Sequence, residues 1–122
     1  MTTAIPKLLN VKAVALAVLD SDRARRFYGE TLGLPPAHED GQAVGFHLGG
    51  TVLLLKDDWY GRPTAEPNPR ITLETTDARG TEAALRERGV VIADPVAAYG
   101  AALVGSFLDS EGNKLWFCSL AP

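Results

Sequence analysis

Residues 14–34 read VALAVLDSDRARRFYGETLGL, and a matching pattern returns in residues 71–91, which read ITLETTDARGTEAALRERGVV. In each stretch apolar residues alternate up to an aspartate, Asp20 or Asp77, and a charged segment of helical spacing then ends at a glycine. Alternation is typical of a strand, and the acid and the glycine are typical of the two caps of a helix. The sequence therefore predicts one strand–helix unit used twice.

The first strand, predicted over residues 11–19, has two different faces because successive side chains alternate across a strand. The face that should pack beneath the following helix carries large apolar side chains: Val14, Leu16 and Val18. The other face carries only methyl groups, from Ala13, Ala15 and Ala17. Small side chains either leave room for a ligand or allow another sheet to approach closely, and this strand alone favours neither interpretation.

The helix that follows should begin at Asp20 or Ser21, because either side chain can accept the free amide hydrogens of the first turn. Its buried stripe recurs at three- and four-residue spacing and consists of Ala24, Phe27, Tyr28 and Leu32. Gly33 permits a left-handed C-terminal turn, and the two prolines that follow prevent the helix from continuing. Turn signals then separate three short strands, predicted at residues 36–39, 42–48 and 51–56.

The second half repeats this plan after a proline-rich connector. We divide the single domain into module one at about residues 11–57, the connector at 58–69 and module two at 70–119. Module two should contain a helix at 78–88 and strands at 71–76, 90–93, 101–109 and 114–119. Residues 109–113 form the predicted turn of the last hairpin, with Gly112 or Asn113 at a positive φ.

Composition excludes several classes of function. The chain has 122 residues, of which 46% are hydrophobic and 22% charged, as expected for one globular domain. A net charge of -3 provides no basic surface for nucleic acid. No apolar run approaches the roughly 18 to 20 residues that span a bilayer, and the N-terminus does not resemble a secretory signal. We therefore expect a cytoplasmic protein without membrane contact, in which the single Cys118 forms no intramolecular disulfide.

The chain resembles the vicinal oxygen chelate superfamily, which includes glyoxalase I, the extradiol dioxygenases, the fosfomycin-resistance proteins and the bleomycin-binding resistance proteins. The resemblance rests on residues 14–34, where a Val-x-Asp step and Phe-Tyr precede Leu-Gly, and on LDSEGNKLWF at residues 108–117. It implies an α+β fold of two tandem βαβββ modules whose sheets curve into one cup. It also implies that the ligand lies in the cup and that the protein is a homodimer.

Enzymes of this superfamily hold a divalent metal with His and Glu side chains at four places. The resemblance puts these places at Ala13, Leu54, Arg70 and Trp116. None of these side chains can ligate a metal, and a cationic guanidinium would repel one. The residues one position away in either direction also offer no carboxylate or imidazole. We therefore expect no metal and no other cofactor.

Other reactive side chains are few. His38 and His47 have no acid or hydroxyl partner at a recognisable spacing, so we interpret them as surface or sheet-face residues rather than catalytic bases. Cys118 alternates with Trp116 toward the cup, but it is interpreted as an inert buried thiol. Trp59 in the connector either anchors the connector locally or contacts the ligand. No catalytic residue is predicted.

The predicted ligand site combines apolar area with few polar groups. Its members are Trp116, Arg70, Glu74, Thr72, Leu54, Ala13, Ala15, Trp59 and Cys118. An aromatic ligand can stack on Trp116 and be oriented by Arg70 or Glu74. The alternative is that Arg70 and Glu74 pair with each other along one strand face and only stabilise the site.

Alternation also predicts how the last strand is oriented. Leu115 and Phe117 should point into the helix-packed core, while Trp116 and Cys118 should point to the opposite face, into the cup.

The favoured function is a metal-independent small-molecule-binding protein of the glyoxalase/bleomycin resistance type, with an aromatic ligand favoured by Trp116 and with antibiotic sequestration as one example. The alternative is a metal-independent lyase or isomerase of the same fold, which would use Arg70 with Glu74 or a histidine for proton transfer. A metal-dependent glyoxalase or dioxygenase is the least favoured, because its ligands are missing from this sequence.

Overall fold

The structure is a computed structural model and describes residues 9–58, 61–67 and 69–122. The elements of module one are β1 (Ala13–Ala17), α1 (Ser21–Arg26), the π-helical turn η1 (Phe27–Thr31), β2 (Pro36–Glu39), β3 (Gln42–Leu48) and β4 (Thr51–Lys56). The elements of module two are β5 (Thr72–Glu74), α2 (Ala78–Glu87), β6 (Val91–Tyr99), β7 (Ala102–Leu108) and β8 (Lys114–Leu120). The predicted α+β class and the two tandem modules are confirmed.

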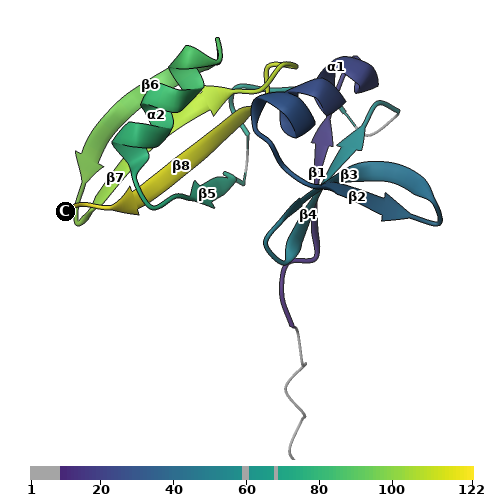
Figure 1. Ribbon diagram of the computed structural model, residues 1–122, viewed down its shortest axis with the longest axis horizontal. Coiled ribbons are helices and arrows are strands. Elements are labelled where there is room, and N and C mark those ends of the chain that lie inside the picture. Colours follow the sequence, from purple (N-terminus) through teal and green to yellow (C-terminus); the bar gives the residue numbers. More distant parts are fainter. Residues whose placement is uncertain (1–8, 59–60, 68) are drawn as a thin grey trace, which may run out of the picture.

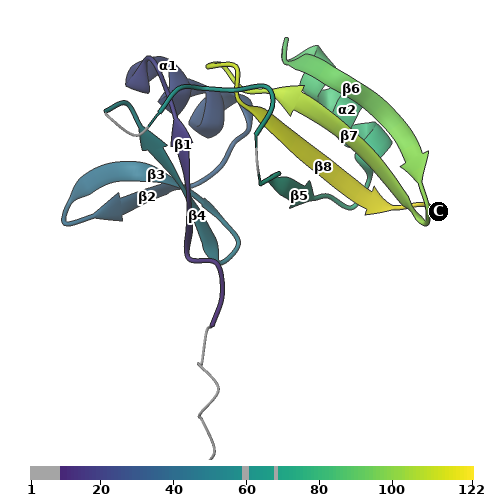
Figure 2. The same ribbon diagram turned by 180° about the vertical axis from the view of Figure 1, so that it is seen from behind.

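The strands form two four-stranded sheets of the same topology, in the orders β1-β4-β3-β2 and β5-β8-β7-β6. In each sheet the first strand of the module pairs in parallel with its last strand, and the remaining pairs are antiparallel. Figures 1 and 2 show the two sheets diverging from the end at which α1 lies. No strand pairing joins the two sheets in the described part of the chain, so β1 and β5 are edge strands and the barrel is not closed.

Several elements differ in extent from the prediction. β1 and β5 are shorter than predicted, with bounds of Ala13–Ala17 and Thr72–Glu74 instead of residues 11–19 and 71–76. β6 has nine residues, not the four predicted at 90–93, and it continues through Pro95. It can do so because β6 is an edge strand, where proline needs no ladder partner, and because register shifts interrupt its pairing with β7. The first helix changes to a π turn, in which the Leu32 amide donates to the Phe27 carbonyl at 2.9 Å. This wider turn buries two consecutive residues, Phe27 and Tyr28.

The two predicted aspartate caps are confirmed. Asp20 accepts a hydrogen bond from the Arg23 amide at 3.0 Å, and Asp77 accepts one from the Gly80 amide at 3.0 Å. Each carboxylate satisfies an amide that has no partner within its helix, so the repeated acid starts both helices in the same way. No helix in the described residues is both long enough and apolar enough to cross a membrane.

One hydrophobic core extends across both modules. The strand face opposite the alanines contributes Leu16, which is 6% exposed. The rings of Phe27 in η1 and Phe107 in β7 lie 6.4 Å apart, and Tyr28 lies 5.2 Å from Phe27 in an edge-on arrangement. Module one therefore packs on module two through the end of its helix.

The turn between β7 and β8 connects the modules through polar contacts. Glu111 accepts the amide hydrogens of Leu19 and Asp20 at 2.7 and 2.8 Å, and it accepts two bonds from the Arg23 guanidinium. The Tyr28 hydroxyl donates to Asp109 at 2.8 Å. Burial, followed by the Asp109 carboxylate, raises the pKa of Tyr28 well above 10, so the phenol remains a neutral donor.

The ionisation of Glu111 depends on these contacts. Burial favours the protonated acid, but hydrogen bonds from Arg23 and from the two amides outweigh it and lower the pKa from 4.5 to about 2. Glu111 is therefore a carboxylate at neutral pH, although the residue is only 7% exposed.

Glu111→Gln should reduce the free energy of unfolding at neutral pH by about 1 to 3 kcal/mol, because an amide cannot accept all of these bonds and leaves Arg23 without its carboxylate. The pKa of Glu111 is lower in the folded state, so the stabilisation is complete above pH 4.5 and is lost as the pH falls toward about 2. Urea unfolding of the two proteins should converge over that range.

Glu30→Gln, at an exposed carboxylate in η1, is the matched control and should change little at any pH. A difference between the wild type and Glu111→Gln that stays constant down to a pH of about 2 would contradict a charged Glu111.

Candidate functional site

The sheet of module two has a face turned away from α2, which we call the open face. By strand register it carries four of the predicted site residues: Thr72, Glu74, Trp116 and Cys118. Leu115 and Phe117 lie on the other face and are 0% and 1% exposed. The alternating residues Trp116 and Cys118 are half-buried. The alternation of the two faces of β8 is confirmed, whereas Trp116 and Cys118, predicted to point into the cup, do not line the cavity that lies between β1 and β5.

Two cations lie over the indole ring of Trp116. The guanidinium carbon of Arg70 is 4.2 Å from the centroid of the ring, and Nζ of Lys114 is 4.3 Å from it. Both distances fall within the range of cation–π attraction. Arg70 therefore contacts Trp116, and it forms no ion pair with Glu74 in the described structure.

Lys114 also has a carboxylate partner. Its Nζ lies 2.6 Å from Oδ2 of Asp94 in β6, and the hydroxyl of Ser106 donates to the same carboxylate. The bonds from Lys114 and then Ser106 lower the pKa of Asp94. Lys114 is thus paired with an ionised acid. The same Asp94 carboxylate also attracts the charge of the exposed Arg70, but among the described residues Arg70 forms no ion pair and no side-chain hydrogen bond.

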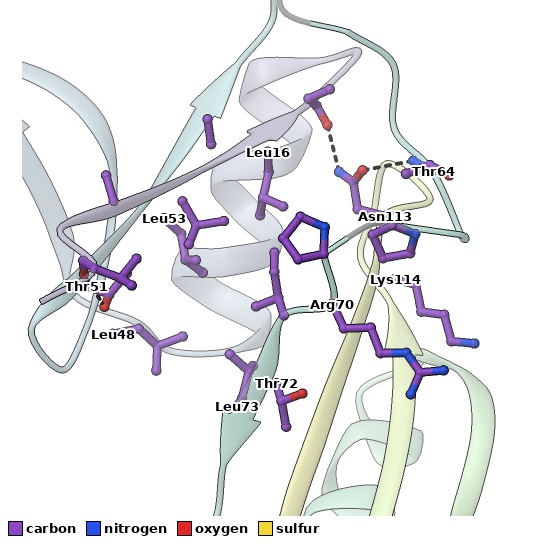
Figure 3. A pocket seen from close by; sticks show the side chains of 18 of the residues that line it. Leu16, Leu48, Thr51, Leu53, Thr64, Arg70, Thr72, Leu73, Asn113 and Lys114 are labelled. Atoms are coloured by element: carbon purple, nitrogen blue, oxygen red, sulfur yellow. Dashed lines mark hydrogen bonds between the residues drawn. The ribbon is translucent and has the colours of Figure 1, made fainter.

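A cavity of about 750 Å³ lies between the edge strands β1 and β5 (Figure 3). Leucines of module one line one side of it, among them Leu16, Leu48 and Leu53. The connector and β5 form the other side, where Arg70 and Thr72 lie. Asn113 donates to the Ala17 carbonyl at 2.7 Å and accepts from the Thr64 amide at 3.0 Å, so it connects β1 to the connector at the edge of the cavity.

The structure brings some of the predicted site residues together and not others. Five line the cavity: Ala13, Ala15, Arg70, Thr72 and Glu74. Leu54, Trp116 and Cys118 do not line it. Trp116 is nevertheless joined to the cavity through its contact with Arg70. Trp59 lies outside the described residues.

Several residues of this region were missed in the sequence. Lys114 lines the cavity, and alternation with Trp116 on β8 could have placed it on the open face. Asp94 could not be found in this way, because it follows a register shift in β6 that no sequence pattern indicates. Arg62 and Thr64 come from the connector, which has no period from which a direction could be predicted.

The positions where the family resemblance puts metal ligands do not suit a cation. Arg70 and Trp116 carry only N–H donors and have no lone pair to offer a metal, and Ala13 and Leu54 are hydrocarbons. The described residues contain no group of three or more His, Cys, Asp or Glu side chains that could hold an ion. A divalent metal therefore does not fit this set of side chains.

The histidines lie away from the cavity, and Cys118 is the cross-strand neighbour of Glu74. His38 and His47 are both exposed, on β2 and β3, and neither lines the cavity. Cys118 is half-buried on the open face.

A second cavity of about 330 Å³ lies between η1 and α2, where Leu32 and Leu85 are among its lining residues.

Comparisons with solved structures agree with the observed topology. The chain is similar to TnmS3, an antibiotic binding protein from Streptomyces sp. CB03234, with 23% identity, a TM-score of 0.77 and coverage of 96% of this chain and 100% of that one. It is similar to a lactoylglutathione lyase from Agrobacterium tumefaciens, with 19% identity, a TM-score of 0.72 and coverage of 90% and 92%. At these identities the likeness establishes the fold alone.

A third similar structure is a member of the glyoxalase/bleomycin resistance protein/dioxygenase superfamily from Sphaerobacter thermophilus, with 22% identity, a TM-score of 0.77 and coverage of 92% of this chain and 98% of that one. No curated protein sequence matches the chain. The family model described as Glyoxalase/Bleomycin resistance protein/Dioxygenase superfamily matches residues 10–117. The protein therefore belongs to the glyoxalase/bleomycin resistance protein/dioxygenase superfamily.

Proposed function

We propose that the protein binds an organic aromatic ligand beside Trp116 and holds it without a metal ion and without turning it over. The observation that carries this proposal is the half-buried indole on the open face, together with Arg70, which lies 4.2 Å from the centroid of its ring and also lines the cavity. An indole provides a large flat area for stacking. The cavity volume of about 750 Å³ lies within the range of small-molecule sites.

The chemistry of the lining supports binding over turnover. Its area comes chiefly from alanine, valine, leucine and proline side chains, which supply shape and apolar contact. General acid–base catalysis needs a titratable pair within hydrogen-bond reach of one reacting atom. Glu74 is the one carboxylate of the described lining, and no histidine accompanies it. Sequestration of a drug-like molecule requires only affinity, and TnmS3, a protein of similar fold, is described as antibiotic binding.

We further propose that two copies of the chain form a dimer through the edges of β1 and β5. Each of these strands has a neighbour on one side only, and an open strand edge presents free backbone groups. Apolar side chains lie exposed just before β1, with Leu9 89% and Val11 63% exposed. A second copy that covers this edge would pair the free backbone groups and would remove the exposed apolar side chains from water. It would also enclose the cavity further.

Trp116→Ala should weaken binding of 2-naphthylmethanol, a neutral planar probe, by about 1 to 3 kcal/mol, roughly ten- to a hundred-fold, because the stacking surface is lost. The free energy of unfolding should fall by less than about 1.5 kcal/mol, because the indole is half-buried rather than enclosed. Isothermal titration calorimetry and urea unfolding provide the two readings.

The matched control is Phe117→Ala, the next residue on β8, whose ring is 1% exposed in the core. It should cost about 3 to 5 kcal/mol of stability. If Trp116→Ala loses as much stability as this control, or binds the probe as well as the wild type, a stacking role for Trp116 is wrong.

Sedimentation velocity at micromolar concentration should show a dimer. Val11→Lys, next to the β1 edge, should shift the protein toward monomer because it places a charge in the proposed contact. Val91→Lys is the control, since Val91 is 60% exposed on β6 at the other end of its sheet. A wild-type protein that sediments only as a monomer would contradict the proposed dimer.

A further inference from the structure

We infer that the ligand of this site is an anion, a planar aromatic carboxylate whose acid group binds Arg70 while its ring lies against Trp116. This inference rests on the proposed function and specifies the chemical class of the ligand. It starts from the guanidinium of Arg70, which lies 4.2 Å from the indole centroid, is exposed, and lines the cavity. Among the described residues the guanidinium forms no ion pair and no side-chain hydrogen bond, so its N–H donors remain available to a ligand, although Asp94 attracts its charge.

The cavity is more positive than the protein as a whole. Three cationic side chains line it, and the lining has one carboxylate among the described residues: the cations are Arg62, Arg70 and Lys114, and the acid is Glu74. Lys114 is already paired with Asp94 outside the lining. The chain as a whole carries a net charge of -3, so the sign of the charge at the cavity is opposite to that of the protein. A local excess of cations attracts anions into the site.

Glu74 forms no ion pair with Arg70 in the described structure. The two residues are four positions apart, which corresponds to about 13 Å along an extended strand. Charges at an exposed surface are largely screened beyond about 8 Å at physiological ionic strength. Glu74 instead pairs in register with Cys118, one step further along the sheet than Trp116. Glu74 therefore disfavours a ligand carboxylate beside Cys118, so an anionic ligand should lie with its acid group toward Arg70.

The aromatic part of the ligand follows from the surroundings of the cation. A guanidinium is planar and binds a carboxylate through two parallel hydrogen bonds. A carboxylate that binds Arg70 in this way lies close to the half-buried indole, over which Arg70 and Lys114 both lie, so a ring attached to it can contact Trp116. Beyond Trp116, on the side of β8 that faces β7, Cys118 pairs with the apolar Val104. A ligand with a flat apolar ring and one acidic end therefore matches the guanidinium of Arg70, the indole of Trp116 and the apolar pair of Cys118 and Val104.

Three probes with the same ring system test the charge requirement: 2-naphthoate, 2-naphthylmethanol and 2-naphthylmethylammonium. Calorimetric titration of the wild-type protein should give affinities in that order, with the anion about ten-fold tighter than the neutral alcohol. Raising the salt concentration should weaken the anion and leave the alcohol nearly unchanged.

Arg70→Gln should remove the preference for the anion by lowering its affinity about ten-fold, while the alcohol changes by less than about two-fold. Arg70→Lys should retain part of the preference, because it keeps the charge and loses the two-bond geometry. Arg26→Gln is the control for net charge, since Arg26 is exposed on α1 and does not line the cavity.

Equal binding of the anion and the alcohol, with no effect of Arg70→Gln, would overturn the inference and leave aromatic binding at Trp116 intact. Tightest binding of the ammonium probe would also overturn it, because Glu74 would then be the residue that selects the ligand. If no probe binds at millimolar concentration, the inference fails together with the stacking site on which it rests.

Discussion

The buried carboxylate of Glu111 holds the two modules of this protein in position. It lies in the turn between β7 and β8, yet its hydrogen bonds go to Leu19, Asp20 and Arg23 at the start of α1. The turn can present it in this way because Gly112 adopts a φ of 95°, which a side chain would disfavour. Desolvating an acid is costly, and two amides with a bidentate guanidinium offset that cost.

The candidate site depends on this contact. Asn113, two residues after Glu111, binds the end of β1 and the connector, so the same turn fixes the separation of β1 from the segment that carries Arg70. That separation defines the cavity, because most of the lining residues come from β1 on one side and from residues 62–67 and 69–74 on the other. A change at the turn should therefore alter ligand affinity even though Glu111 does not line the cavity.

Much of the fold could be predicted because local signals agreed with one another. Both aspartate caps, the strands of module one and the two faces of β8 follow from periodicity and turn residues, which act over a few positions. The length of β6 and the contacts of Glu111 could not be predicted, because they depend on neighbours in space. The same division applies to the site. Alternation placed Trp116 on the open face, whereas the pairing of Lys114 with Asp94 crosses strands whose register is shifted.

Native mass spectrometry of the purified protein, incubated with a naphthalene probe, weighs bound ligand and bound metal in one measurement. The chain should gain the mass of the probe and carry no zinc, nickel, iron or manganese ion, because Ala13, Leu54, Arg70 and Trp116 occupy the places of the metal ligands. Metal-free binding at this site would be wrong if about one metal ion per chain were retained through dialysis and if the probe bound only in its presence.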